Sequence, residues 1–193
     1  MEKEAKSILN ISERLDESFS KAIDLLNTPD KKIIITGIGK SGHLGKRMAA
    51  TFSSTGTPAA FLHPSEAVHG DLGIHQEKDP VIFLSNSGTT QELIFLEPIL
   101  HARSSKIVAI VGKSPSPLSK VADVTLYAGV SEEADPLGIV PTSSFAVASS
   151  IADALASVLM TEKKFSETDY LKTHPAGQLG RNLMYRESDV MKK

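Results

Sequence analysis

The 193-residue sequence predicts a single α/β domain: a doubly wound sheet of five parallel strands with helices on both faces. Three observations lead to this prediction. Five short runs rich in β-branched residues are apolar throughout, which is typical of strands buried on both faces. Segments of helical character alternate with these runs, as the crossovers between parallel strands require. The length suits one domain better than two.

The chain opens with apolar residues at steps of three and four from Ile8 to Leu26, before the turn at Asn27–Asp30. This spacing predicts one helix within residues 1–30 that packs on the domain. Strands are expected at Ile33–Thr36, Ala59–Leu62, Val81–Leu84, Ile107–Val111 and Val124–Tyr127. Helices are expected at Gly42–Ser54, Thr90–His101 and Pro117–Val121. We expect the second of these helices to kink or break near Glu97, because Pro98 lies inside it.

Residues 129–141 show no regular pattern, and Thr142–Met160 is apolar almost all round. A helix without a solvated face is buried either in the core or between subunits. The stretch Phe145–Met160 also contains three serines and Asp153, and we interpret it as too short and too polar to span a membrane.

Composition narrows the function classes. The net charge is -2, from 21 basic and 23 acidic residues without a run of either sign, so nothing favours nucleic acid or an anionic membrane as a partner. The absence of cysteine excludes disulfides, thiolate nucleophiles and Cys-ligated metals. The amino terminus lacks the basic start and apolar core of a signal peptide, so we expect a cytoplasmic protein.

Ligands of open parallel sheets bind where the strands end, and polar corners follow the first and third strands. The first corner, Thr36–His43, combines glycines with a lysine and the start of a helix. It has neither P-loop nor dinucleotide-fingerprint spacing, and a tight turn with a solvated lysine explains it equally well. The second corner, Ser85–Thr90, offers more hydroxyls than one N-cap needs, which favours a phosphate site at a helix N-terminus.

Three other loops carry titratable residues. They are His63–Asp71, Glu132–Gly138 and Thr173–Gly177, the last two held by proline and glycine. Rigid loops are good places for general acids and bases, although an ordinary surface loop explains each segment taken alone. The histidine spacing fits no metal site, and we expect neither a metal nor a cofactor.

Four stretches together resemble the SIS (sugar isomerase) domain family, and within it the D-arabinose-5-phosphate isomerases. They read TGIGKSGHLGKRMAATFSSTGTPAAFLHPSEAVHGDLG, SNSGTTQEL, EEADPLGIVPTSS and KTHPAGQLGRNL, and the resemblance extends from Ile33 to Leu183. The resemblance implies a phosphate site from Ser41, Ser85, Ser87 and Thr90, and a site-lining His69. It also implies catalytic roles for Lys40, Glu92, Glu133 and His174. Related proteins share the active site between subunits of a dimer or tetramer, so His174 is expected to act in a neighbouring subunit.

The chain departs from the family pattern at two positions: Thr89 stands where Glu is common, and Asp135 where Cys is common. Typical members continue into two CBS modules, which we do not expect in residues 1–193. The resemblance implies interconversion of D-arabinose 5-phosphate and D-ribulose 5-phosphate through an enediol, supplying Kdo biosynthesis. The pathway served, whether lipopolysaccharide, capsule or sugar-alcohol catabolism, stays open.

In this scheme Glu133 is the first choice for the base and Glu92 the second, His174 an acid/base for ring opening, and Lys40 the cation near the enediolate or the phosphate. Two alternatives remain open. One is a non-enzymatic sugar-phosphate regulator, and the other is an isomerase of another sugar phosphate such as 3-hexulose 6-phosphate.

Overall fold

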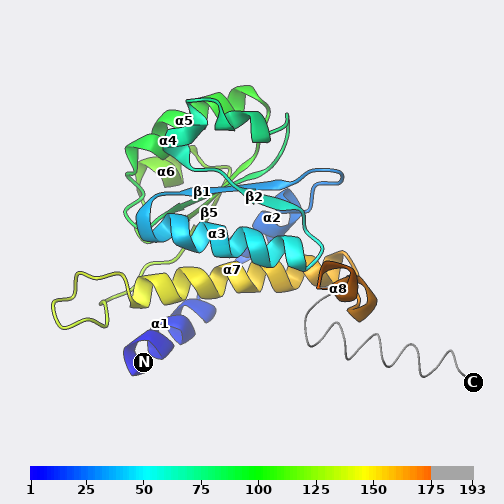
Figure 1. Cartoon of the computed structure of the whole chain (residues 1–193). Coiled ribbons are helices and arrows are strands. Elements are labelled where there is room, and N and C mark those ends of the chain that lie inside the picture. The colour runs from blue at the N-terminus through cyan, green and yellow to red at the C-terminus, as the bar shows by residue number, and fades with distance from the viewer. Residues whose placement is uncertain (175–193) are drawn as a thin grey trace, which may run out of the picture.

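The computed structural model describes residues 1–174, and within them one sheet of five parallel strands confirms the predicted fold class (Figure 1). The strands are β1 (Ile33–Gly37), β2 (Ala59–Phe61), β3 (Val81–Ser85), β4 (Ile107–Val111) and β5 (Val124–Tyr127). Their order is β2-β1-β3-β4-β5, so the chain winds outward from β1 to β2 and then returns to the other side of β1. The winding direction reverses between β1 and β3, where doubly wound sheets bind ligands.

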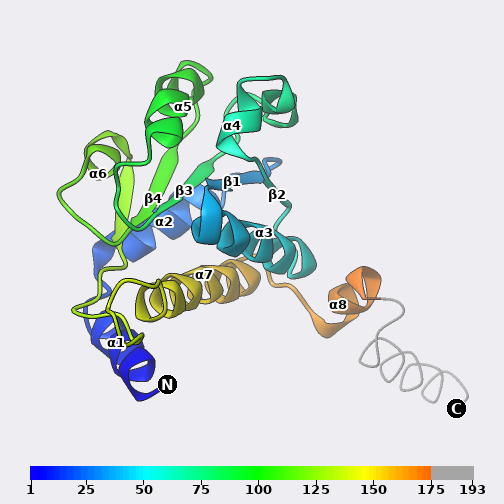
Figure 2. The same cartoon turned by 60° about the vertical axis from the view of Figure 1, so that its left-hand side comes forward.

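Helices form a layer on each face of the sheet (Figure 2). One layer contains α2 (Glu17–Leu26), α3 (Gly39–Ser54) and α7 (Ser143–Glu162), with α1 (Glu2–Ser12) packed on the outer side of α7. The other contains α4 (Pro64–Ala67), α5 (Gln91–Ala102) and α6 (Pro117–Val121), with the short 3-10 helix η1 (Asp71–Ile74) beside α4. Helix α8 (Glu167–Thr173) ends the described part of the chain.

Alternate strand residues supply the two cores. Ile33, Ile35 and Ile82 face α2, α3 and α7, whereas Ile34 and Phe83 face α5 and α6. All five side chains are fully buried. Burial on both faces is the physical reason why these strands read as continuous apolar runs rather than as alternating ones.

The predicted single N-terminal helix is wrong, because the structure has two helices, α1 and α2, in its place. Asp16 has an extended backbone, and its side chain accepts a hydrogen bond of 2.8 Å from the Ser18 N–H. This N-cap ends one helical path and starts another. The apolar spacing continued through the break because both helices pack against the same core.

Helix α5 runs without a break from Gln91 to Ala102, so the expected break near Glu97 is not observed. Proline removes one backbone N–H, but Leu93, Leu96 and Leu100 are fully buried and hold the helix against the sheet.

Helix α7 has 20 residues and an apolar composition, so by length and composition it could cross a membrane. By these two criteria, the expectation that this stretch is too short and too polar for a membrane span is wrong. One such helix within residues 1–174 is weak evidence of a span, since core helices pass the same test. Leu155 and Leu159 are fully buried, and Arg47 of α3 donates to Asp153 of α7 at 2.8 Å. These contacts place one face of α7 in the core, which was one of the two expectations for this stretch.

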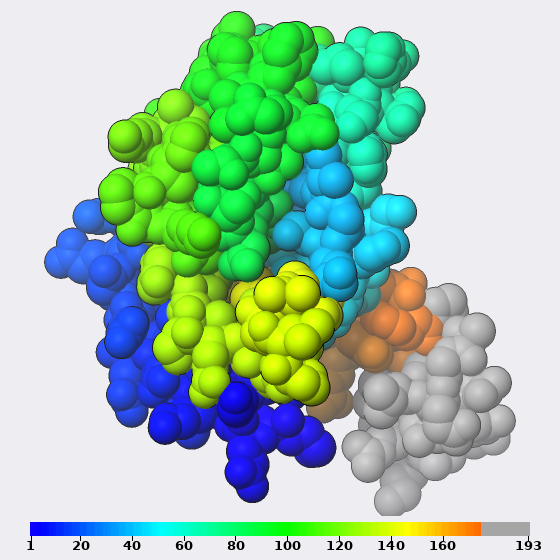
Figure 3. All heavy atoms as spheres, turned by 90° about the vertical axis from the view of Figure 1, so that its left-hand side faces the viewer, coloured from blue at the N-terminus to red at the C-terminus, as the bar shows by residue number. Residues whose placement is uncertain are grey.

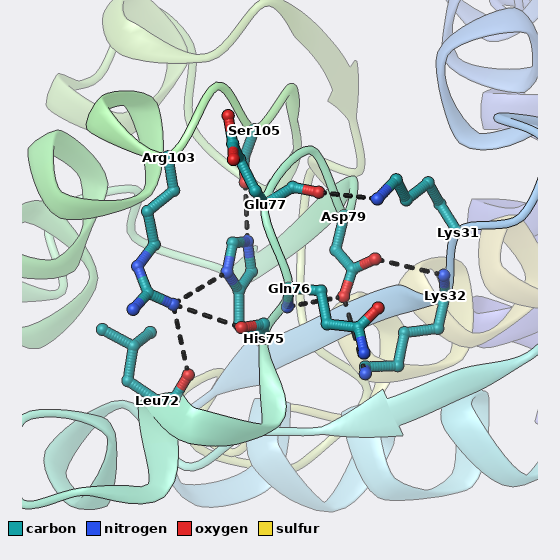
Figure 4. Close-up of polar contacts among 9 residues, drawn as sticks. All are labelled: Lys31, Lys32, Leu72, His75, Gln76, Glu77, Asp79, Arg103 and Ser105. Carbon is teal, nitrogen blue, oxygen red and sulfur yellow. Dashed lines mark hydrogen bonds and ion pairs between the residues drawn. The ribbon is translucent and has the colours of Figure 1, made fainter.

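A buried polar cluster fastens the opposite edge of the sheet, at the amino ends of the strands (Figure 4). The Asp79 carboxylate is fully buried and accepts a hydrogen bond from the Lys32 N–H at 3.3 Å. His75 Nε2 lies 2.6 Å from Ser105 Oγ, and the Arg103 guanidinium donates to the His75 carbonyl oxygen at 3.1 Å. These contacts tie the loop before β3 to the starts of β1 and β4.

Candidate active site

A cavity of about 370 Å³ opens at the carboxyl edge of the sheet, next to the reversal between β1 and β3. Gly37 and Leu84 are paired across these strands, so the loops that follow them lie side by side. Figure 3 shows the face on which the starts of α3, α5 and α7 come together. The cavity is lined by Ile38, Lys40, Ser41, Leu44, Leu84, Ser85, Asn86, Ser87, Thr90, Ile110, Gly112, Ala128, Pro141, Ser144, Phe145 and Ala148.

The first corner places Lys40 and Ser41 in the opening turn of α3, which begins at Gly39 rather than at the expected Gly42. Gly39 has a φ of 59°, which lets the chain turn directly from strand to helix. The N-cap, Ile38, supplies no side-chain hydrogen bond, so the first N–H groups of α3 remain available to a ligand. No carboxylate within residues 1–174 pairs with Lys40.

The second corner folds around Ser85, which is buried. Ser85 Oγ lies 2.7 Å from Thr90 Oγ1 and accepts a hydrogen bond from the Gly88 N–H at 3.1 Å. Gly88 has a φ of 67°, and a Cβ there would lie 2.2 Å from Ser116 Oγ. Glycine is therefore required for both the backbone conformation and the close packing against α6.

The hydroxyls of this corner are not ordinary N-caps. Thr90 occupies the N-cap position of α5 but makes no side-chain cap hydrogen bond. The first N–H groups of α5 therefore receive no hydrogen bond from the N-cap side chain, and they follow directly on the cavity-lining Thr90. This arrangement suits an anion with several acceptor oxygens, and the phosphate site expected here stays a prediction.

The third wall comes from the start of α7 and from Pro141, two residues before that helix. Phe145 and Ala148 make this wall apolar, and Ser144, which is buried, adds a hydroxyl. Sequence reasoning missed these residues, although Ser144 lies within the quoted EEADPLGIVPTSS stretch. It also missed Asn86, whose neighbours in the SNSG segment were recognised.

Glu133 contacts this wall but is not among the residues that line the cavity. Its Oε2 accepts hydrogen bonds from the Thr142 N–H at 2.9 Å, the Thr142 hydroxyl at 3.2 Å and the Ser144 N–H at 3.1 Å, and its Oε1 accepts one from the Ser144 hydroxyl. Partial burial acts to raise the pKa of Glu133, but these hydrogen bonds outweigh it and lower the pKa. The carboxylate thus caps α7 and touches a cavity residue.

Glu92 and His69 are both exposed and do not line the cavity. Glu92 lies in the first turn of α5, two residues beyond the cavity-lining Thr90. His69 lies between α4 and η1, in the connection that follows β2. The structure therefore brings Lys40 and the four hydroxyl residues together and leaves these two side chains outside.

His174 lies at the far end of α3 from the cavity. The neighbouring Thr173 donates its hydroxyl to the Ser54 carbonyl oxygen at 3.1 Å, and Ser54 is the last residue of α3. Ser54 lies thirteen positions after Ser41 along the helix, a length of about 20 Å. The His174 ring stacks on Tyr170, with centroids 3.8 Å apart. His174 therefore cannot reach the cavity of its own chain in this arrangement.

Residues 1–174 contain no group of three His, Asp or Glu side chains arranged to hold a metal ion. His63 and His69 fall within the described residues and take part in no such group. The expected surroundings of His174 from Pro175 onward, including the AGQLGRNL stretch, lie outside the described residues.

Comparison with known proteins identifies the family. The SIS domain matches residues 28–158. The arabinose 5-phosphate isomerase KdsD of Francisella tularensis is 45% identical over 193 residues, covering 98% of this chain and 59% of that protein. The KdsD of Pseudomonas aeruginosa is 42% identical over 188 residues, 97% of this chain and 58% of that protein. The chain thus spans a little under 60% of the length of the curated relatives it matches.

Solved structures give the same result. A phosphosugar isomerase of Bacteroides fragilis involved in capsule formation is 39% identical, with a TM-score of 0.86 over 90% of this chain and 92% of that one. A protein of Escherichia coli CFT073, solved in complex with A5P, is 36% identical, with a TM-score of 0.86 over 91% and 93% of the two chains. The matched fold, the hydroxyl-rich corner at the sheet reversal and the sequence identity agree, and the chain belongs to the SIS domain family.

Proposed function

We propose that this protein is an aldose–ketose isomerase that interconverts D-arabinose 5-phosphate and D-ribulose 5-phosphate through an enediol. One observation carries the proposal: the cavity combines Ser85, Ser87 and Thr90 with Lys40 at the sheet reversal. The chemistry needs an anchored phosphate, a base for the proton at C1 or C2, and a positive group near the developing enediolate. The KdsD relatives, at 45% and 42% identity, support this reaction over others of the family.

The phosphate is proposed to bind the hydroxyls of the second corner and Ser41, between the starts of α3 and α5. Holding this end fixes the sugar chain against the wall formed by α7, and orientation of this kind makes proton transfer effectively intramolecular. Lys40, which lies in the same lining, supplies positive charge to the phosphate or the enediolate.

Glu133 remains our first choice for the base and Glu92 the second. Glu133 touches Ser144, a lining residue, whereas Glu92 is exposed and outside the lining. The lowered pKa keeps Glu133 ionised at neutral pH, but its hydrogen bonds to α7 also weaken it as a base. We therefore expect substrate binding to exchange some of these hydrogen bonds before proton abstraction.

His174 is proposed to enter the cavity of a second copy of the chain, and His69 to line the site. His174 is separated from its own cavity by the length of α3, and a neighbouring subunit places it at another cavity without any refolding. An apolar groove of about 220 Å³ between α1 and α7, lined in part by Ile8, Leu15 and Ala154, supports self-association. We propose a homodimer or homotetramer with shared sites.

The proposal extends to the setting of the reaction. We propose that the enzyme works in the cytoplasm without a cofactor and supplies Kdo for lipopolysaccharide. Nothing in its charge or in the cavity favours nucleic acid or a membrane as a partner.

A coupled assay tests the proposal directly. Purified protein is given D-arabinose 5-phosphate, and ribulose 5-phosphate formation is followed, with D-ribose 5-phosphate and a ketohexose 6-phosphate in parallel. Turnover of arabinose 5-phosphate alone supports the proposed reaction. Turnover of the ketohexose 6-phosphate alone would show that the substrate is a hexulose phosphate instead of arabinose 5-phosphate. Binding of all three without turnover would favour a sugar-phosphate regulator.

A further inference from the structure

The hydroxyl of Ser144 donates its proton in a hydrogen bond to the carboxylate of Glu133. Ser144 donates both its backbone N–H and its hydroxyl to Glu133, each to a different carboxylate oxygen. Glu133 is ionised, because its pKa is lowered, so it can only accept. The direction of this hydrogen bond is therefore fixed without knowledge of hydrogen positions.

A hydroxyl carries one donor and two acceptor lone pairs. With the donor facing Glu133, the remaining capacity of Ser144 Oγ is that of an acceptor. Ser144 is only 4% exposed, and it lines the cavity among Pro141, Phe145 and Ala148, none of which has a polar side chain. The wall at α7 thus offers a ligand one side-chain acceptor in apolar surroundings.

The opposite wall has the reverse polarity. Lys40 and the unfilled N–H groups at the starts of α3 and α5 are donors, and they suit an anion. A ligand that satisfies both walls has an anionic group at one end and a hydrogen-bond donor at the other. A polyhydroxylated phosphate ester has both.

We propose that Ser144 contacts the substrate and helps to set its specificity, accepting a hydrogen bond from a hydroxyl of the sugar chain while Glu133 holds the proton of Ser144. This inference rests on the proposed function, because it takes the ligand to be a sugar phosphate. It adds a chemical rule: a hydroxyl is accepted at this position, and a carboxylate or second phosphate, which brings only acceptor oxygens, is rejected.

Thr142 provides the matched control. Its hydroxyl also donates to Glu133, at 3.2 Å, but Thr142 does not line the cavity. The variants Ser144→Ala and Thr142→Val therefore each remove one hydroxyl donor from Glu133, and only the first alters a residue that lines the cavity. Ser144→Cys keeps the side-chain volume and replaces the hydroxyl with a weakly hydrogen-bonding thiol, which guards against a packing effect.

The experiment measures dissociation constants of D-arabinose 5-phosphate and inorganic phosphate by titration calorimetry, with thermal unfolding as the check on folding. A hydroxyl that donates to a carboxylate is a strong hydrogen-bond acceptor. Ser144→Ala and Ser144→Cys are therefore expected to weaken the binding of arabinose 5-phosphate about 10- to 100-fold. Inorganic phosphate, which lacks the sugar hydroxyl, is expected to bind within about twofold of wild type. Thr142→Val is expected to change both affinities by less than about threefold.

Two results would overturn the inference: equal losses for the sugar phosphate and inorganic phosphate in Ser144→Ala, or equal losses in Ser144→Ala and Thr142→Val. Wild-type protein that binds arabinose 5-phosphate no more tightly than inorganic phosphate would overturn it as well. These readouts are binding constants, so they remain decisive if the isomerase assay fails. A protein that binds arabinose 5-phosphate through Ser144 without turnover would overturn the proposed function and leave this inference standing.

Discussion

Ser85 and Thr90 are hydrogen-bonded to each other at the two ends of the hydroxyl-rich corner, with Ser85 Oγ and Thr90 Oγ1 2.7 Å apart. Ser85 ends β3 and Thr90 is the N-cap of α5, so this one hydrogen bond joins the strand to the helix across the turn. Both side chains also line the cavity. In the proposed phosphate site, this contact orders the two side chains before any ligand arrives, which reduces the entropy lost on binding.

Removing the hydroxyl of Thr90 should weaken phosphate binding. Thr90→Val keeps the side-chain shape but removes both the contact to Ser85 and a group in the lining, and we expect about 3- to 10-fold weaker binding of inorganic phosphate. Thr125→Val is the control, since the Thr125 hydroxyl donates to the Ser119 carbonyl oxygen at 3.3 Å, outside the cavity lining. Calorimetric titration compares the two. Equal affinities in the two variants would contradict a role for Thr90 in the phosphate site.

Most of the fold was predictable because the sheet is buried on both faces. Ile107–Val111 and Val124–Tyr127 were predicted to the residue, and the other strands to within one residue at one end. The N-terminal segment was not predictable from apolar spacing, since Ile11 and Leu26 join the same core from two helices. The break depends on the Asp16 cap, which spacing does not reveal.

The site was predictable only where it follows strands. Lys40, Ser41, Ser85, Ser87 and Thr90 all line the cavity, because the ends of parallel strands meet at one edge. Ser144 was missed because the preceding loop, residues 129–141, has no pattern that shows where α7 begins relative to the sheet. Distances between distant segments, such as Glu133 to α7, require coordinates.

Replacing Gly88 should destabilise the protein more than replacing Gly138. Both glycines have a φ of 67°, so alanine at either position incurs the strain of the left-handed region, about 1–2 kcal/mol. A Cβ at Gly138 meets nothing within 4 Å, whereas one at Gly88 lies 2.2 Å from Ser116 Oγ. Urea unfolding of Gly88→Ala and Gly138→Ala separates the collision from the strain. Equal losses would mean that Ser116 moves aside at no cost.

His75 should make the protein less stable as the pH falls. Burial is the main cause that lowers the pKa of His75, and the neighbouring Arg103 guanidinium adds to it. As the pH falls, His75 therefore takes up a proton in the unfolded state before it does so in the folded state. The contribution of neutral His75 to the free energy of unfolding is complete above pH 6.5, and it is lost as the pH falls through the lower pKa of the folded state. Urea unfolding between pH 5 and 7.5 should show this slope in wild type and a shallower one in His75→Gln. Parallel curves would exclude His75 as its source.

His101 should give a slope of the opposite sign. Partial burial acts to lower the pKa of His101, but hydrogen bonds with Glu97 and Asp123 outweigh it and raise the pKa. The stabilisation that protonated His101 gives the folded state is complete below pH 6.5, and it is lost as the pH rises through the higher pKa of the folded state. The difference in unfolding free energy between wild type and His101→Gln should therefore be largest near pH 6 and shrink toward pH 9. A difference that grows with pH would reverse the assignment.

Glu133→Gln should collapse turnover and leave binding intact. A general base contributes roughly 10²- to 10⁴-fold, so we expect kcat for arabinose 5-phosphate to fall by about that factor, with the dissociation constant changed by only a few fold. Glu132→Gln is the control, because the exposed neighbour pairs with Lys3 at 2.7 Å and does not line the cavity. Turnover and calorimetric binding are measured on the same preparations.

Binding is what separates the two roles of Glu133, base and cap of α7. If its main role were to hold the start of α7, Glu133→Gln would displace Ser144 and Phe145 from the cavity wall. Arabinose 5-phosphate affinity and the melting temperature would then fall together with kcat. Loss of kcat with retained affinity and melting temperature supports the base. Retained kcat removes Glu133 from that role, and Glu92→Gln becomes the decisive variant.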